Sequence, residues 1–157
     1  MCVDGVTVFT PDVEECSSHR PVHVTNHTGF LASITSAETG CGTSEAPWSI
    51  EALPGQRINI TLLDFAGSDV VSSSADQTSD GLARVCRVYA TIRESSDKRS
   101  MTVCGGESRV KTVHVSSEHQ VELRVISSHS PPQPVSFIFR YQSKCVLLGF
   151  SKSLSLD

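Results

Sequence analysis

The chain has 157 residues, a hydrophobic fraction of 38% and a net charge of −4 at pH 7. This length fits one domain with a sizeable core. The mild negative charge, and the absence of any run among the thirteen Lys and Arg residues, disfavour nucleic acid and a polybasic membrane anchor as partners. No apolar stretch approaches the roughly 20 residues that span a bilayer, so we expect no membrane insertion within this chain.

Residues 1–15 have neither the basic region nor the apolar region of a signal peptide. We predict that they form an N-terminal extension, and that an extracellular protein with this sequence is an excerpt or a mature form of a longer chain.

The stretch "HRPVHVTNH" spaces His19, His23 and His27 by four residues, which on a helix would align three metal ligands. Pro21 and the β-branched residues that follow it oppose a helix. On a strand, residues four apart lie about 13 Å from each other, too far for one ion. We therefore expect three exposed histidines beside a strand.

Polarity alternates with a period of two along most of the chain, and Gly, Pro, Ser and Asp clusters separate the alternating segments. This pattern predicts an antiparallel all-β domain with two sheets packed face to face and no helix. In "CRVYATIR" it assigns Val88 and Ala90 to the face opposite Tyr89. The predicted strands lie near residues 22–25, 29–34, 47–52, 57–65, 82–93, 100–104, 110–116, 120–127 and 135–141.

Two segments between these strands read as irregular. Residues 66–81 are rich in Ser and Asp and form a long surface loop, which either carries binding residues or is a plain connector. Residues 129–134, "HSPPQP", form a stiff turn before the last strand.

The six cysteines indicate the redox compartment of the protein more directly than its composition does. No two are closer than fourteen positions, and no Cys-x-x-Cys pair suggests zinc. An even number of widely spaced cysteines favours disulfides in an oxidising compartment over free thiols, although six cysteines permit fifteen pairings. They are Cys2, Cys16, Cys41, Cys86, Cys104 and Cys145.

Two triplets, beginning at Asn26 and Asn59, have the pattern of N-glycosylation acceptors. In "QRINITLLDF", alternation places Asn59 on the face opposite Ile58 and Ile60, so a glycan there would point into solvent. The alternative is an ordinary polar residue on an exposed strand face.

The order of these features resembles the CUB domain, a jelly-roll-like β-sandwich of extracellular and cell-surface proteins. The resemblance covers residues 16–141 and leaves 142–157 as a C-terminal extension. It rests on a cysteine followed by "GFLAS", a second cysteine before "PWSIEALPGQRINITLLDF", a cysteine-bracketed hairpin ending in Cys-Gly, and a closing "FIFRY". Two spacings depart from the family: Cys41 lies seven residues before Trp48, and one residue too many separates Cys86 from Tyr89.

The resemblance implies the disulfides Cys16–Cys41 and Cys86–Cys104. Cys2 and Cys145 then remain, and they either pair with each other or bond to neighbouring modules.

Many CUB domains bind calcium through acidic side chains at one end. The resemblance places Ala90 and Ser128 at two of those acidic positions, while Asp64, Asp69 and Glu94 remain nearby in the pattern. Because calcium takes six to eight oxygen ligands, the incomplete set disfavours a calcium site, and we expect no cofactor.

The sequence has no Gly-x-Ser-x-Gly elbow and no phosphate-binding loop, so we expect no enzyme, although a spatial Ser-His-Asp set is not testable from sequence. The leading hypothesis is an extracellular or cell-surface recognition module that binds a protein partner or a glycan, within a larger secreted protein, receptor or co-receptor. The alternative is a structural or oligomerisation domain of a secreted protease or receptor, with no ligand of its own.

Overall fold

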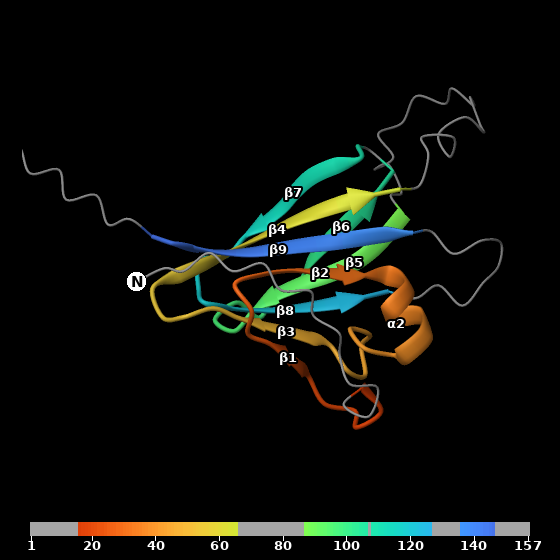
Figure 1. The fold of residues 1–157 in the computed structure, drawn as a ribbon, viewed down its shortest axis with the longest axis horizontal. Coiled ribbons are helices and arrows are strands. Elements are labelled where there is room, and N and C mark those ends of the chain that lie inside the picture. The colour runs from red at the N-terminus through yellow and green to blue at the C-terminus, as the bar shows by residue number, and fades with distance from the viewer. Residues whose placement is uncertain (1–15, 66–86, 107, 127–135, 147–157) are drawn as a thin grey trace, which may run out of the picture.

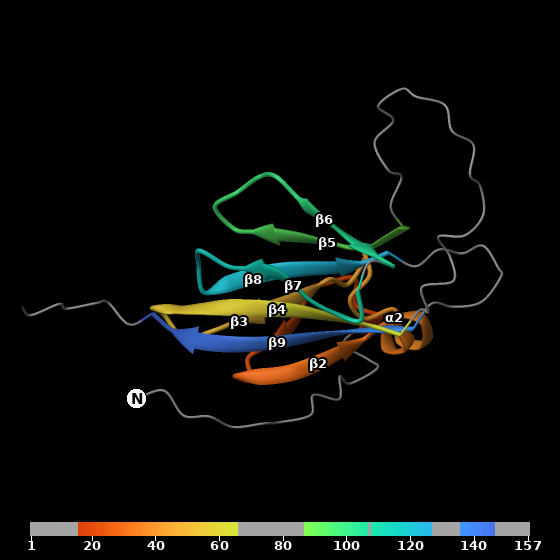
Figure 2. The same ribbon diagram turned by 90° about the horizontal axis from the view of Figure 1, so that it is seen from above.

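The computed structural model describes residues 16–65, 87–106, 108–126 and 136–146. Within these ranges, nine strands and one short helix form two facing sheets (Figures 1 and 2). Each predicted strand has a counterpart within these ranges, and the all-β sandwich is confirmed; residues 82–86, 127 and 135 of the predicted strands, the predicted loop 66–81 and the predicted turn 129–134 lie outside the described residues. The elements are β1 (Val22–Val24), β2 (Thr28–Ala32), α2 (Ser33–Thr39), β3 (Trp48–Glu51), β4 (Gln56–Asp64), β5 (Arg87–Glu94), β6 (Met101–Gly105), β7 (Val110–Val115), β8 (Gln120–Val125) and β9 (Phe137–Cys145).

The strands divide into a five-stranded sheet, in the order β1-β3-β8-β5-β6, and a four-stranded sheet, in the order β2-β9-β4-β7. The strand pairs in the described ranges are antiparallel except β1 with β3, which is parallel. The β9 strand lies beside β4 over its whole length, from Phe137 opposite Asp64 to Cys145 opposite Gln56 (Figure 1).

The core lies between the sheets and is filled by the inward residues of the alternating strands. Trp48, Phe139 and Tyr141 are the largest fully buried side chains. Burial of each large apolar side chain stabilises the fold by about 1.5–3 kcal/mol. Gly29 lies directly against the ring of Tyr141, so that strand β2 can approach β9 only without a side chain there.

The helix α2 corrects the prediction of an entirely helix-free domain. It follows β2 directly and ends at Gly40, which adopts the left-handed conformation at φ 78° and donates its N–H to Ser36 O at 3.0 Å. Among its seven residues only Ser36 is buried. The segment therefore lacks the apolar stripe that reveals a helix in a sequence.

The last strand is longer than predicted. The predicted end at residue 141, which also marked the end of the CUB-like domain, falls inside β9, because residues 142–145 continue the pairing with β4. The sequence "QSKC" has no alternation of apolar and polar residues, because this end of β9 is partly or fully exposed and needs no apolar side chains.

A β-bulge in β5 corrects the predicted orientation of two side chains, Val88 and Tyr89. The register with β6 shifts between Val88 and Ala90. Tyr89 and Ala90 are therefore both buried, whereas Val88 is exposed.

Candidate functional site

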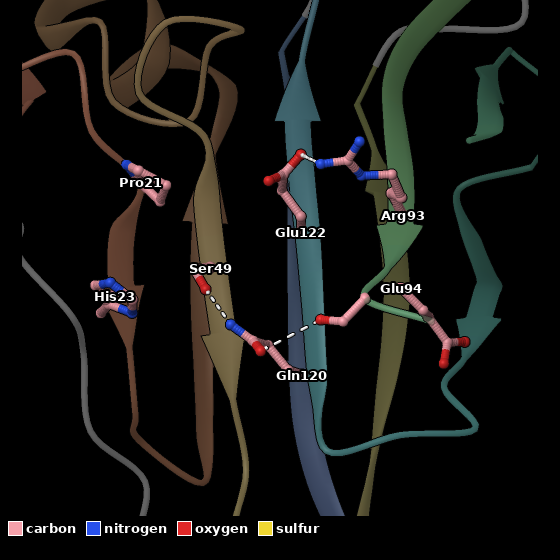
Figure 3. Close-up of a pocket in the computed structure, with 8 residues that line it drawn as sticks. Pro21, His23, Ser49, Arg93, Glu94, Gln120 and Glu122 are labelled. Atoms are coloured by element: carbon pink, nitrogen blue, oxygen red, sulfur yellow. Dashed lines mark hydrogen bonds and ion pairs between the residues drawn. The ribbon is translucent and has the colours of Figure 1, made fainter. Parts of the chain in front are cut away.

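The outer face of the five-stranded sheet holds a shallow depression of about 150 Å³ (Figure 3). A cross-strand row runs through it, in which His23 pairs with Ser49, Ser49 with Glu122, and Glu122 with Arg93. Alternation places these side chains outside the sandwich, because their neighbours Val22, Trp48, Leu123 and Ile92 point into the core.

Gln120 is the centre of the hydrogen-bond network in this depression. Its Nε2 donates to Ser49 Oγ and to Glu51 Oε1, each at 3.1 Å, and its Oε1 accepts from Ser95 Oγ at 3.3 Å. Figure 3 shows the amide side chain reaching from β8 towards Ser49 on β3. Glu51 Oε1 also lies 3.0 Å from His23 Nδ1.

Glu122 joins the remaining charges of the depression. Its Oε1 lies 2.7 Å from Arg124 Nε and 3.4 Å from Arg93 Nη2. The charged groups are thus paired with one another across the sheet. A volume of 150 Å³ is also below the roughly 300–1,000 Å³ of small-molecule sites. This face is therefore a polar surface whose groups bond to one another, and its depression is too small for a typical small-molecule site.

The depression contains part of a hydrolytic arrangement but not its reactive contact. His23 and Glu51 form the pair that orients a catalytic histidine in such sites. In the described residues, however, His23 and Ser49 share no hydrogen bond, and Ser49 Oγ accepts from Gln120 instead. The nucleophile-to-base hydrogen bond on which such chemistry depends is not assembled here.

The three histidines predicted beside a strand do not converge. His23 lies on β1 against Glu51, and His19 lies against Glu45 at 3.2 Å. No cluster of three or more His, Cys, Asp or Glu side chains suited to a metal occurs in the described part of the chain.

Glu94 connects the end of β5 to the turn between β7 and β8. Its carboxylate lies 2.8 Å from His114 Nε2 and accepts hydrogen bonds from Ser117 Oγ at 2.6 Å, from Ser117 N and from Glu118 N. Burial alone would raise the pKa of Glu94, but the hydrogen bonds from Ser117, His114 and Glu118 together hold this pKa below its ordinary value.

Asp64 forms a second connection between the sheets, at the other end of β5. It is 2% exposed, and its carboxylate accepts from the Tyr89 hydroxyl at 3.1 Å and from Gly106 N at 2.7 Å. Burial, and then the hydrogen bond and charge of Asp64, raise the pKa of Tyr89 to about 12. The Tyr89 ring stacks on Phe137 at a centroid distance of 4.2 Å.

The residues considered for calcium are separated in space. Tyr89, which holds Asp64, lies five positions before Glu94 on β5, a distance of about 17 Å along a strand. Asp64 and Glu94 therefore cannot share one ion. Ala90 is fully buried between the sheets, and Asp69 and Ser128 lie outside the described residues. That the protein needs no cofactor remains an expectation.

The disulfide Cys16–Cys41 is confirmed. Cys104 and Cys145 are also disulfide-bonded, but Cys2 and Cys86 lie outside the described residues, so both remaining pairings stay predictions.

The two glycosylation candidates are less exposed than expected. Asn26 is partly buried in the connection between β1 and β2. Asn59 is on the outward face of β4, as alternation predicts, but it is partly buried because β4 lies between β7 and β9. Its Oδ1 is covered and has no hydrogen-bond partner in the described structure. Glycosylation at both positions remains a prediction.

The outer face of the four-stranded sheet has an apolar end that sequence reading did not identify. Pairing across the four strands aligns Ala32, Ile138, Leu63 and Val110, which we call the apolar row. Val110 is 63% exposed, and the neighbouring Phe30 and Phe65 are 40% and 64% exposed. These residues come from distant parts of the chain, so their clustering requires knowledge of the strand order.

No helix in the described ranges is long and apolar enough to cross a membrane. Comparison with known proteins finds no protein-family model and no curated protein that matches the chain. Among solved structures, the chain is similar to the full extracellular region of zebrafish Gpr126/Adgrg6, with a TM-score of 0.51 and 20% identity. The match covers 80% of this chain and 15% of that one. At this identity it shows a shared fold, found in the extracellular region of a receptor.

Proposed function

We propose that this chain is a divergent CUB-like domain that acts as a non-enzymatic, extracellular protein-recognition module within a larger secreted or cell-surface protein. The CUB resemblance in the order of cysteines and strands supports this assignment, as do the two-sheet fold and its disulfides. The similarity to an extracellular receptor region is compatible with the same location.

The observation that carries the proposal is the apolar row. Single exposed apolar residues are normal on protein surfaces, whereas contiguous apolar patches mark interaction sites. Here the row crosses all four strands, and Phe30 and Phe65 extend it on the same outer face. A protein partner would remove these side chains from water and gain roughly 25 cal/mol for each Å² of apolar surface covered.

The polar face of the five-stranded sheet is the weaker candidate for this contact. Its carboxylates, guanidinium groups and amide already bond to one another, so a partner would have to replace existing interactions. Such exchange contributes little net free energy, because polar groups in the free protein are already satisfied.

The alternative, a structural or oligomerisation domain without a separate ligand, would use the same apolar row to join two copies. Sedimentation velocity of the secreted domain distinguishes the two. A concentration-dependent dimer that Val110→Ser dissociates would support the alternative, and a monomer would support recognition of another protein.

The test of recognition uses the tetramerised domain and an array of extracellular domains. The variant combines Phe65→Ser with Val110→Ser, and the control combines Leu53→Ser with Met101→Ser, which removes exposed apolar side chains elsewhere. We expect a partner that the parent and the control retain and the variant loses. Equal binding by all three proteins would contradict the role of the apolar row.

A further inference from the structure

The opposite end of the four-stranded sheet's outer face is cationic. Arg57 on β4 and Lys144 on β9 are directly paired across the strands, and Arg140 lies four residues earlier on β9, opposite Thr61. All three side chains are exposed. Arg140 and Lys144 are about 13 Å apart along the strand, while directly opposed residues have Cβ atoms about 5 Å apart.

Among the described residues, no acidic side chain neutralises the three cations. Like charges in directly opposed positions destabilise a sheet. Asp64 is the only acidic residue in β2, β4, β7 and β9, and it points into the interior. In the described structure Arg57, Arg140 and Lys144 form no ion pair. A chain of net charge −4 thus keeps three cations together, and within the described ranges none of them has an ion-pair partner.

Two amides complete the cationic surface. Asn59 and Gln142 are paired with each other between Arg140 and the Arg57–Lys144 pair. Amide and cationic side chains together can donate many hydrogen bonds to anionic oxygens. We define the cationic end as Arg57, Asn59, Arg140, Gln142 and Lys144.

We propose that the cationic end binds a sulfated polysaccharide chain. An extended polyanion can place successive sulfate groups on Arg140 and on the Arg57–Lys144 pair without entering a pocket. Single-stranded nucleic acid is disfavoured because Phe30, opposite Arg140, is the one exposed aromatic side chain beside the cationic end in the described residues, whereas such binders stack successive bases on several rings. A membrane is disfavoured because the side chains between the cationic positions, Asn59 and Gln142, are polar amides that would not enter a bilayer.

The inference depends on the proposed function only for the extracellular location in which such a polysaccharide would be met. The apolar row, which carries protein recognition, crosses β4 at Leu63, about 20 Å from Arg57, and crosses β9 at Ile138, two residues before Arg140. The two proposals are tested with different substitutions and different readouts, so failure of polysaccharide binding would leave protein recognition intact.

Asn59 makes the experiment sensitive to glycosylation, since a glycan there would project over the cationic end. Asn26 is also close, because the adjacent His27 accepts a hydrogen bond from Ser143 N. The test therefore uses secreted protein carrying Asn26→Gln and Asn59→Gln as the parent.

The test is salt elution from immobilised heparin at pH 7. In the first variant, Arg57, Arg140 and Lys144 are all changed to Gln. In the matched control, the exposed Arg20, Lys98 and Arg99 are changed to Gln, so that both variants carry three fewer positive charges. By counterion release, three contacts give a log–log salt slope of about −2 to −3. We expect the parent and the control to show this slope and the first variant to lose retention.

The proposal is overturned if the first variant elutes with the parent, or if both variants lose retention equally. Equal binding to desulfated heparin, to anionic phosphatidylserine vesicles or to single-stranded DNA would overturn it as well. The first variant should melt at or above the temperature of the parent, because it loses the Arg57–Lys144 repulsion. If the first variant melts at a lower temperature, the single variant Arg140→Gln replaces it in the test. Reduced heparin retention of this single variant would support the proposal, and unchanged retention would contradict it.

Discussion

Replacing Glu94 with glutamine tests the connection between β5 and the β7–β8 turn. The carboxylate accepts hydrogen bonds from two backbone N–H groups and the Ser117 hydroxyl, and it contacts the His114 ring. Glutamine keeps the shape of the side chain, but it removes the negative charge and turns one acceptor oxygen into a donor nitrogen. That nitrogen then faces donors on one side of the site.

The expected loss follows from the number and kind of bonds. A hydrogen bond to a charged group contributes about 1.5–3 kcal/mol, and a donor left without an acceptor costs about 1–3 kcal/mol. Oε2 accepts from Ser117 N, Ser117 Oγ and Glu118 N, and Oε1 contacts His114 Nε2 and shares Ser117 N, so the amide replaces an acceptor on one side and removes the charge from every remaining bond. We expect Glu94→Gln to lower the free energy of unfolding by about 2–3 kcal/mol at pH 7.

The effect should depend on pH with a defined sign. The pKa of Glu94 is lower in the folded protein than its ordinary value of 4.5, so its ionised form favours the folded state. This contribution is fully present above the unfolded pKa and is lost as pH falls through the folded pKa. The difference between parent and variant should therefore be constant from pH 7 to about 5.5 and should shrink below about 4.5.

Urea unfolding monitored by Trp48, the single tryptophan, provides the measurement. Glu38→Gln is the matched control, because it removes the same charge from an exposed position on α2. We expect the control to stay within about 0.5 kcal/mol of the parent. A loss below about 0.5 kcal/mol for Glu94→Gln, or a difference that persists unchanged at acid pH, would refute the reasoning.

Four further predictions use the same protein. Gly105→Ala should destabilise by about 3 kcal/mol, because its Cβ would overlap the Tyr89 ring, and an unchanged urea midpoint would contradict this. Non-reducing peptide mapping should link Cys86 to Cys104, and another partner for Cys86 would break the CUB resemblance. Glycosidase should reduce the mass of secreted protein, less so after Asn59→Gln; an unchanged mass would remove this support for secretion. Calcium should leave the melting temperature unchanged, and a rise that a chelator reverses would show an ion site.

Strand positions were predictable wherever one face is buried and the other is exposed. Val121, Leu123 and Val125 alternate with polar residues on β8, and the structure buries all three. The helix α2 was not predictable in this way, because it rests on the sandwich through Ser36 and carries no apolar period.

The bulge at Tyr89 shows a different limit. Val88, Tyr89 and Ala90 are all apolar or aromatic, so the sequence permits either face for each of them. The extra residue between Cys86 and Tyr89, noted as a departure from the CUB pattern, was the available signal. The direction in which this extra residue turns Tyr89 depends on the hydrogen bond from the Tyr89 hydroxyl to Asp64, and these two residues are 25 positions apart in the sequence.

The two ends of the four-stranded sheet's outer face could not be predicted from local sequence. Arg57 and Lys144 are opposed only because β9 pairs with β4 across the intervening chain. The thirteen Lys and Arg residues form no run, yet the fold gathers three of them on one surface. Charge clustering of this kind becomes visible only with strand order and register.

The long pairing of β9 has a mechanical consequence. Cys16 is bonded to Cys41 near the end of the sandwich where β9 begins, and Cys145 is at the end where β9 finishes. A pulling force between these two points acts along the strand axis. It loads the hydrogen bonds of β9 with β4 and β2 in shear, all at once, and does not unzip them one by one. We expect the domain to resist extension between these two points more strongly than a force that peels β9 away from its neighbours.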